Sequence, residues 1–368
     1  MKAPDALLSL LAEGVTRGRF AGVSARVEQD GRVLFEAEMG NARLHPEAEA
    51  SAAEAATLWD LASLTKPLAG AALVLALVDA RLLSLDDEVS RFDDLFKKTR
   101  FSGVTLRRLL LHTAGLVEWH PLYVRGEGRA AYRRALADLD PDGPPSVRVV
   151  YSCPGFLLLS DVVEHVSGRP VDSFFRERIS APLGLSKDLL FSPKGEDRRR
   201  AAGGERDDAT ERLKVADLGL VYAGFRSGVV NGEVNDGNAY RRGDGVALNA
   251  GLFGTARAVA AAARAWVERD PRLLSEGSVV EALRCQTAGL NEDRGLGWAL
   301  ARNVRSAGDA LAPESFGHTG FTGSSLFADP RTRRIYVLLA NRLHPEARSA
   351  EEMIAFRRRF HDLAAELT

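Results

Sequence analysis

Strand-forming patterns lie near the two ends of this chain, and helical patterns fill its middle. Residues 21–40 form two β-type runs around Asp30 and Gly31, a dipeptide that favours tight hairpin turns. Near the other end three runs are typical of strands: 295–301, 315–329 and 333–342, the last two joined at Asp329 and Pro330. Because a sheet must bury a face, we expect both ends of the chain to meet in one antiparallel sheet.

The middle of the chain predicts helices that flank this sheet. Apolar periodicity indicates helices over 6–17, 61–83, 105–115, 130–138, 155–167 and 349–366. The pattern predicts an α/β fold of the α+β type in a single unit, 1–368, with an α/β region (about 1–80 and 250–368) and an inserted, mainly helical region (about 81–249). Residues 193–212 predict a solvated loop, in which Arg198, Arg199 and Arg200 are balanced by Glu205, Asp207 and Asp208.

Composition narrows the classes of function. The net charge of -1 leaves no overall field for nucleic acid or an anionic membrane, so the expected partner is a small molecule, with the oligomeric state open. Two distant cysteines, Cys153 and Cys285, argue against a disulfide scaffold or a thiolate metal site, and we expect no metal and no cofactor. The apolar stretch 6–12 is short for a secretory signal and the uncharged run 67–78 is short for a bilayer span, which predicts a cytoplasmic protein.

The run "LASLTKPLAG" places Ser63 and Lys66 three residues apart at the head of an apolar helix. Side chains at this spacing share a helix face. Burial would lower the pKa of the lysine, which could then accept a proton and activate the serine as a nucleophile. The helix start would also direct backbone N–H groups toward developing negative charge. The alternative is a chance pair on a surface helix.

Two further stretches contain candidate residues. "VVYSCPGF" supplies Tyr151, whose phenol could shuttle protons near a cation, although a lone tyrosine is more often a core residue. "FGHTGFTGSS" supplies His318, Thr319 and Gly320 within the predicted strand, where glycine would admit a substrate backbone against the strand edge. The N–H of Phe321 could then join that of Ser63 as an oxyanion donor. A structural histidine is the alternative reading of His318.

Together these motifs resemble the serine β-lactamase and penicillin-binding-protein superfamily, whose signature begins with Ser-x-x-Lys. The resemblance is to the class C-like branch, with its β-lactamase-related esterases and D-amino-acid peptidases. The matching segments keep the order of the family: "WDLASLTKPLAG", "LLLHTAGL", residues 151–185, "NAGLFGTARAVA" and "FGHTGFTGSSLFADP". The resemblance implies a β-lactamase/transpeptidase-like fold.

The resemblance also implies roles for the candidate residues. Ser63 would be the acylated nucleophile, Lys66 its proton partner and Tyr151 the base. His318 stands where many relatives carry a lysine, and it would orient Tyr151 and tune its charge. The amides of Ser63 and Phe321 would hold the oxyanion beside Thr319 and Gly320. The implied reaction is acyl transfer to water through a covalent acyl-enzyme, without a metal.

Cys153 departs from the family pattern, in which asparagine is common at this position. A thiol donates and accepts hydrogen bonds weakly, which weakens the case for penicillin or cephalosporin hydrolysis more than that for ester cleavage. Lys66 could stabilise a reactive Cys153 thiolate, but a small buried thiol that fills space is the favoured interpretation. We expect a structural role for His112 in "LLLHTAGL".

The favoured function is that of a serine hydrolase with esterase activity. One alternative keeps the chemistry and changes the substrate, as in a β-lactamase or a D-amino-acid peptidase. Another is a catalytically silent binding module on the same fold. The mechanism predicts that activity falls as acid protonates the Tyr151–Lys66 pair and His318.

Overall fold

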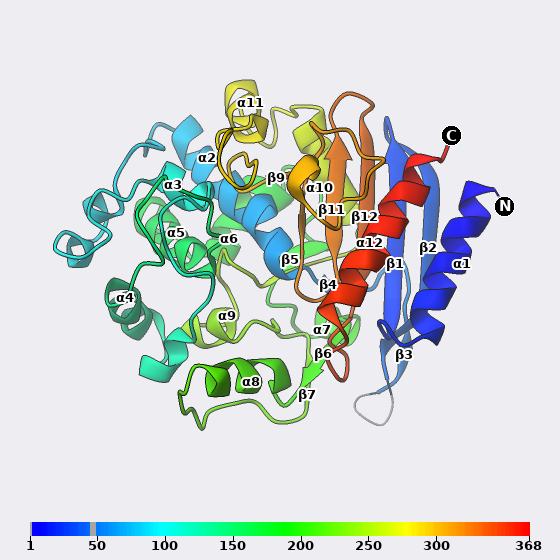
Figure 1. Cartoon of the computed structure of the whole chain (residues 1–368), viewed down its shortest axis with the longest axis horizontal. Coiled ribbons are helices and arrows are strands. Elements are labelled where there is room, and N and C mark those ends of the chain that lie inside the picture. Colours follow the sequence, from blue (N-terminus) through cyan, green and yellow to red (C-terminus); the bar gives the residue numbers. More distant parts are fainter. Residues whose placement is uncertain (1, 45–48) are drawn as a thin grey trace.

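The computed structural model describes residues 2–44 and 49–368 (Figure 1). Its α-helices are α1 (Ala3–Thr16), α2 (Ala72–Asp79), α3 (Leu106–Leu110), α4 (Arg129–Ala137), α5 (Cys153–Ser167), α6 (Val171–Phe175), α7 (Glu196–Arg199), α8 (Ala209–Asp217), α9 (Gly237–Arg242), α10 (Ala256–Val267), α11 (Glu276–Leu283) and α12 (Ala350–Ala365). Its strands are β1 (Gly22–Gln29), β2 (Arg32–Arg43), β3 (Ser51–Ala52), β4 (Trp59–Asp60), β5 (Leu189–Phe191), β6 (Gly203–Arg206), β7 (Val229–Asn231), β8 (Leu252–Gly254), β9 (Ala299–Leu300), β10 (Phe316–Thr319), β11 (Ser325–Asp329) and β12 (Arg334–Ala340).

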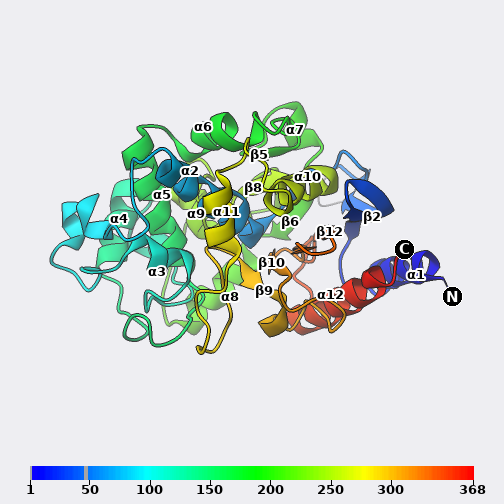
Figure 2. The same cartoon turned by 90° about the horizontal axis from the view of Figure 1, so that it is seen from above.

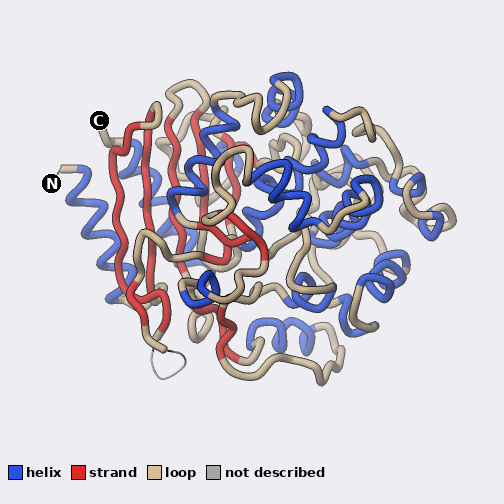
Figure 3. Tube along the Cα trace, turned by 180° about the vertical axis from the view of Figure 1, so that it is seen from behind, coloured by secondary structure: helices blue, strands red, loops and turns tan. Residues whose placement is uncertain are grey.

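Both ends of the chain meet in a seven-stranded sheet, as the sequence predicts. The strand order is β3-β2-β1-β12-β11-β10-β9, and every pairing is antiparallel. The junction between the two ends is the β1–β12 pair, in which Val23 lies opposite Ala340. Figure 3 shows the long strands side by side with helices on both faces of the sheet.

Alternate residues of the central strands face two different cores. On β12, Val337 and Leu339 pack into the larger core, which extends into the helical region. Tyr336 and Leu338 point the other way, into a core closed by α1 and α12. Figure 2 shows these two terminal helices lying together beside the sheet, at the end of the molecule away from α3 and α4. Residues buried on both faces explain why β12 is almost continuously apolar.

The hairpin at the N-terminal end is confirmed, whereas one predicted strand is in fact two. Asp30 and Gly31 have φ of 50° and 76°, the left-handed geometry that a two-residue hairpin needs. The segment 315–329 is not a single strand, because residues 320–324 turn between β10 and β11 and Gly323 has φ of 114°. The stretch 295–301 contributes only the two residues of β9.

Most predicted helices form, with changed ends. The long helix expected from residue 61 is a short 3-10 turn, Ala62–Leu64, a π-helical turn, Lys66–Ala71, and then α2, which ends at Asp79. The predicted helix 105–115 is limited to α3, because His112 turns the chain with φ of 58°. The segment Ala62–Asp79 is long and apolar enough to cross a membrane, and 83% of it is buried inside the protein, which is typical of a core helix.

The solvated loop predicted for 193–212 is wrong. This stretch contains α7, β6 and the start of α8, and the side chains of Glu205 and Asp208 are fully buried. The expected charge pairing is also wrong, because Arg198 pairs with Glu233 and Arg200 with Asp188 and Asp197. Asp208 can leave water because it pairs with Arg226 and Arg241, and Glu205 because it accepts hydrogen bonds from Thr210 N–H and Asn235 Nδ2.

Candidate active site

Ser63 follows a sharp backbone turn that the half-buried carboxylate of Asp60 holds in place. It lies in the 3-10 turn Ala62–Leu64, directly after β4, and Ala62 has φ of 46°, a costly conformation for a residue with a Cβ. The Asp60 carboxylate accepts the Ala62 N–H at 2.8 Å and the Asn235 N–H at 2.7 Å. Burial raises the pKa of Asp60 to about 6. The strained turn carries Ser63 to the wall of two cavities.

Lys66 is fully buried and directs its ammonium at the serine. Its Nζ donates to Ser63 Oγ at 3.0 Å, to the Asn249 carbonyl at 2.9 Å and to Cys153 Sγ at 3.5 Å. Burial acts to lower the pKa of Lys66, but the ionised forms of Cys153 and Tyr151 raise it more, so that pKa lies above its usual value. The expected lowering of this pKa is therefore wrong, and Lys66 is a cation in the resting site.

Tyr151 lies two residues before the start of α5 and is the second side chain that contacts Ser63. Its hydroxyl donates to Ser63 Oγ at 2.7 Å, and Lys66 Nζ lies 4.8 Å from its ring centroid. His112 supports it, because its Nδ1 accepts the Ser152 N–H at 2.9 Å and its ring centroid lies 4.7 Å from that of Tyr151. Burial raises the pKa of Tyr151 even though Lys66 acts to lower it. The hydroxyl of Ser63 therefore accepts hydrogen bonds from both of its predicted partners.

Cys153 begins α5, and its Sγ lies 3.5 Å from Lys66 Nζ. Burial raises the pKa of its thiol more than Lys66 lowers it. A thiol with a raised pKa is a poor nucleophile at neutral pH. The raised pKa argues against a reactive thiolate, and the partly buried thiol lines the smaller cavity.

The turn after β10 packs directly on the Ser63 segment. A Cβ on Gly320 would lie 2.7 Å from the Leu61 carbonyl oxygen, so only glycine allows this approach. The Thr322 hydroxyl donates to the Asp60 carbonyl at 2.8 Å. Thr319 ends β10 and lines the same cavity as Ser63, together with the partly exposed ring of Phe321. The structure therefore brings the predicted oxyanion segments side by side.

His318 lies beside Tyr151 but remains uncharged. Burial lowers its pKa to about 3, with the positive charges of Arg294 and Lys66 acting in the same direction. Its Nδ1 lies 2.8 Å from the Thr319 carbonyl, and its ring centroid is 5.8 Å from that of Tyr151. With a pKa of about 3, His318 does not titrate in mild acid, so the expectation that its protonation lowers activity there is wrong.

Two cavities open on Ser63. The larger has a volume of about 640 Å³ and extends along the β10 turn to α12, with Arg294, Arg342 and Arg357 in its wall. The smaller, about 110 Å³, lies between Trp119 and α8; its other lining side chains include Cys153, Glu211, Lys214 and Asp236. Sequence reasoning missed all of these wall residues except Cys153. The adjacent motifs contain no signal for them, because their burial arises only when distant segments pack.

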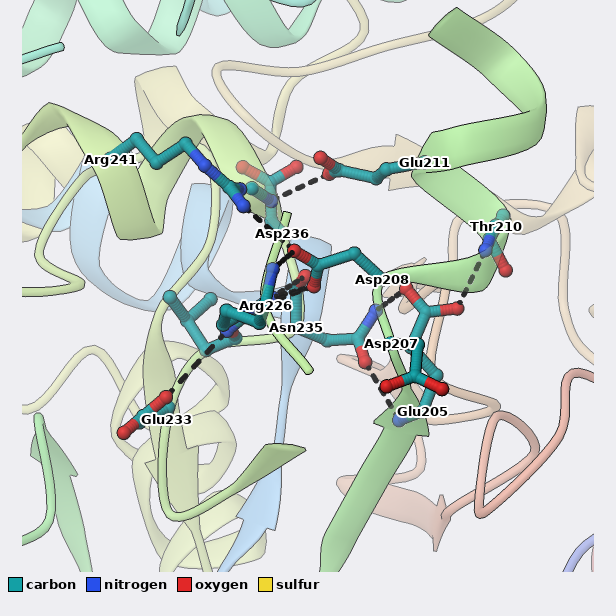
Figure 4. A network of polar contacts seen from close by, with 12 residues as sticks. Glu205, Asp207, Asp208, Thr210, Glu211, Arg226, Glu233, Asn235, Asp236 and Arg241 are labelled. Atoms are coloured by element: carbon teal, nitrogen blue, oxygen red, sulfur yellow. Dashed lines mark hydrogen bonds and ion pairs between the residues drawn. The ribbon is translucent and has the colours of Figure 1, made fainter. Parts of the chain in front are cut away.

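The wall of the smaller cavity that α8 forms, which we call the helical-side wall, is held by a network of buried charges. Figure 4 shows this network. Asp208 forms ion pairs with Arg226 and Arg241, and each guanidinium nitrogen lies 2.7 Å from a carboxylate oxygen. Glu211 accepts the Tyr123 hydroxyl at 2.7 Å and the Gly237 N–H at 2.6 Å. Burial raises the pKa of Glu211 to about 7. These contacts tie α8 to the segment that follows it and fix one side of the smaller cavity.

Comparison with known proteins identifies the family. The sequence profile described as Beta-lactamase matches residues 7–357. The chain belongs to the Beta-lactamase family.

In the part of the chain that the structure describes, no group of three or more His, Cys, Asp or Glu side chains could hold a metal ion.

The proteins that this chain resembles differ in the activities named for them. A protein of Escherichia coli O157:H7, provisionally named a D-alanyl-D-alanine carboxypeptidase, is 27% identical over 355 residues, 88% of this chain and 79% of its own. Among solved structures, EstCE1, described as a hydrolase with promiscuous acyltransferase activity, has a TM-score of 0.73 at 20% identity over 98% of both chains. A class C β-lactamase mutant has a TM-score of 0.73 at 16% identity, over 97% of this chain and 96% of its own. The structural likenesses show a β-lactamase fold, and the family match identifies a hydrolase of that fold.

Proposed function

We propose that this chain is a serine hydrolase that cleaves esters through a covalent acyl-enzyme on Ser63. The observation that carries the proposal is the pair of hydrogen bonds at Ser63 Oγ, 3.0 Å from Lys66 Nζ and 2.7 Å from the Tyr151 hydroxyl. A hydroxyl placed between an ammonium and a phenol can lose its proton as it attacks a carbonyl carbon. When the Lys66–Tyr151 pair has lost one proton, it takes the proton of Ser63 and later returns it to the leaving alcohol.

The reaction then runs in two balanced halves. Ser63 Oγ forms a bond to the acyl carbon, and the ester C–O bond breaks as the leaving oxygen takes the proton. In the second half, water attacks the acyl carbon and gives one proton to the same pair. The bond from that carbon to Ser63 Oγ then breaks as the pair returns the proton to Oγ, which releases the carboxylic acid and free Ser63. The N–H groups of Ser63 and Phe321 hold the oxyanion in both halves.

One feature supports an ester as the preferred substrate. Cys153 leaves only a weak hydrogen-bonding group near Lys66, at 3.5 Å, where an amide substrate gains from a stronger donor. An alkyl or aryl ester does not need that donor.

The first prediction concerns the nucleophile. Wild-type protein should form one covalent adduct with a fluorophosphonate and hydrolyse p-nitrophenyl butyrate, and Ser63→Ala should lose both activities, with kcat falling by at least about 10³-fold. Intact mass and initial rates are the measurements. Thr65→Ser, which keeps the buried hydroxyl that donates to the Ala62 carbonyl at 2.6 Å, is the matched control and should keep the adduct. Equal turnover by Ser63→Ala and wild type would refute the proposal.

A second candidate function is hydrolysis of a D-amino-acid peptide or a β-lactam. The E. coli relative provisionally named a carboxypeptidase favours it. The same assay distinguishes the two, because a chromogenic cephalosporin or a D-Ala-D-Ala peptide turned over faster than p-nitrophenyl butyrate would make the second candidate the function.

A further inference from the structure

Two arginines stand behind the β10 turn, and neither has a carboxylate partner among the described residues. Arg357, from the middle of α12, is buried with 6% of its surface exposed, and Arg342, just after β12, with 5%. Both donate to backbone carbonyls instead. Burying a cation without a counter-ion costs several kcal/mol, so such a placement calls for a compensating role.

Arg357 binds two carbonyls of the β10 turn, and one of them belongs to the peptide that carries the Phe321 N–H. Its Nη2 donates to the Gly320 carbonyl at 2.6 Å and its Nε to the Gly323 carbonyl at 3.1 Å. The Gly320 oxygen also accepts the Gly323 N–H at 3.1 Å, which closes the turn. The Gly320 carbonyl and the Phe321 N–H belong to the same planar peptide unit. A guanidinium on the carbonyl therefore acts directly on the N–H at the other side of that unit.

We infer that Arg357 is the positioning residue of the oxyanion hole: it orients the Gly320–Phe321 peptide and polarises the Phe321 N–H toward the oxyanion formed from Ser63. The inference rests on the proposed function. A charged donor on a carbonyl withdraws electron density from the peptide and strengthens the hydrogen bond that its N–H donates. The cation also lies in the wall of the larger cavity, where a buried positive charge stabilises an anion on the substrate.

Arg342 provides an internal comparison. Its Nη2 and Nε donate to the Phe321 carbonyl at 2.8 and 3.2 Å, and this carbonyl belongs to the next peptide unit, whose N–H is that of Thr322. Arg342 therefore holds the same turn without acting on the Phe321 N–H. Burial and the neighbouring Arg342 lower the pKa of Arg357 to about 9, so that Arg357 keeps its charge at neutral pH.

The test compares kcat, KM and a spectroscopic signature in four variants. Arg357→Met should lower kcat for p-nitrophenyl butyrate by about 10- to 100-fold and leave KM within about twofold, because the contact acts on the transition state. Arg357→Lys, which keeps a charge but reaches fewer acceptors, should lie between Arg357→Met and wild type. Arg342→Met should lower kcat less than Arg357→Met. Arg358→Met, a change of the next residue on α12, where Arg358 is exposed and pairs with Asp309, should match wild type.

The acyl-enzyme carbonyl gives a readout that a purely structural role would not move. With a ¹³C-carbonyl benzoyl ester, its infrared stretch should move to higher frequency in Arg357→Met and by less in Arg342→Met, since a weaker oxyanion donor polarises the ester less. If Arg357→Met fails to fold by circular dichroism, the same two measurements on Arg357→Lys decide. An unchanged kcat and stretch, or an equal loss in Arg342→Met, would overturn the inference. Wild type that forms no acyl-enzyme would instead refute the proposed function.

Discussion

Two walls beside Ser63 bury arginines in opposite ways: the helical-side wall at α8, and the sheet-side wall, which is the wall of the larger cavity that contains Arg294, Arg342 and Arg357. On the helical side, Arg226 and Arg241 both pair with the fully buried Asp208. On the sheet side, Arg294 pairs with Glu292, but Arg342 and Arg357 donate their hydrogen bonds to backbone carbonyls, and Arg342 also lies over the Phe321 ring. The first wall is held together by ion pairs to a shared buried carboxylate, whereas the second keeps two arginines without such a pair at the edge of the cavity where an oxyanion would form. Arginine side chains thus stabilise the fold in the helical-side wall and supply a positive electrostatic field in the other wall.

The largest expected effect comes from breaking the helical-side wall. Asp208→Asn removes the charge that both arginines share, and the free energy of unfolding should fall by about 3–5 kcal/mol. Asparagine tolerates the left-handed conformation of Asp208, which has φ of 50°, so the loss reports on the charge rather than on the backbone. Urea denaturation followed by circular dichroism measures it.

The control for Asp208 is an aspartate that pairs at the surface. Asp309 pairs with Arg358 while 78% of its side chain is exposed, so Asp309→Asn should cost less than about 1 kcal/mol. Similar losses in the two variants would show that burial does not distinguish these ion pairs, and the contrast between the walls would fail.

The contrast also explains what the sequence could and could not predict. Ser63 and Lys66 are three residues apart, so local helical geometry predicts their contact. Tyr151 and the turn at Gly320 were found because they lie in motifs that resemble those of a family. Asp208 and Arg357 lie in ordinary charged stretches that are typical of solvent-exposed segments, and only the packing of distant elements buries them. The π-helical turn at Lys66–Ala71 and the split of 315–329 into two strands likewise depend on backbone geometry that periodicity does not report.

The next effect is the pH dependence of activity. The attacking base is the Lys66–Tyr151 pair after it has lost one proton, and the pKa of each member is raised above its usual value. The base form is therefore scarce at neutral pH and becomes more abundant as pH rises. We expect kcat/KM for p-nitrophenyl butyrate to rise about tenfold per pH unit, or about 100-fold between pH 6 and 8.

The titration of His318 should not affect the dependence of kcat/KM on pH. Its pKa of about 3 keeps it neutral across the whole range, so no inflection is expected near 6.5. A thermal scan at each pH serves as the control, because it separates loss of folded protein from loss of activity. A plateau below pH 8, or a step near 6.5, would contradict the assignment of the base to the Lys66–Tyr151 pair.

The smallest expected effect is that of the Arg294 charge, in the sheet-side wall, on the pKa of His318. Arg294 lies over the Tyr151 ring, 5.6 Å from its centroid, and its charge adds to burial in lowering the pKa of His318. Arg294→Met should therefore raise the pKa of His318 by a few tenths to about one unit, while burial keeps it below the usual value. The imidazole ¹⁵N chemical shift of His318 at pH 5, assigned by its loss in His318→Asn, measures the change. Arg331→Met, which removes an exposed arginine paired with Glu314, should leave that shift unchanged. If Arg294→Met leaves it unchanged as well, the positive charge of this wall does not reach the catalytic side chains, and the field at Ser63 must then come from the turn held by Arg357 alone.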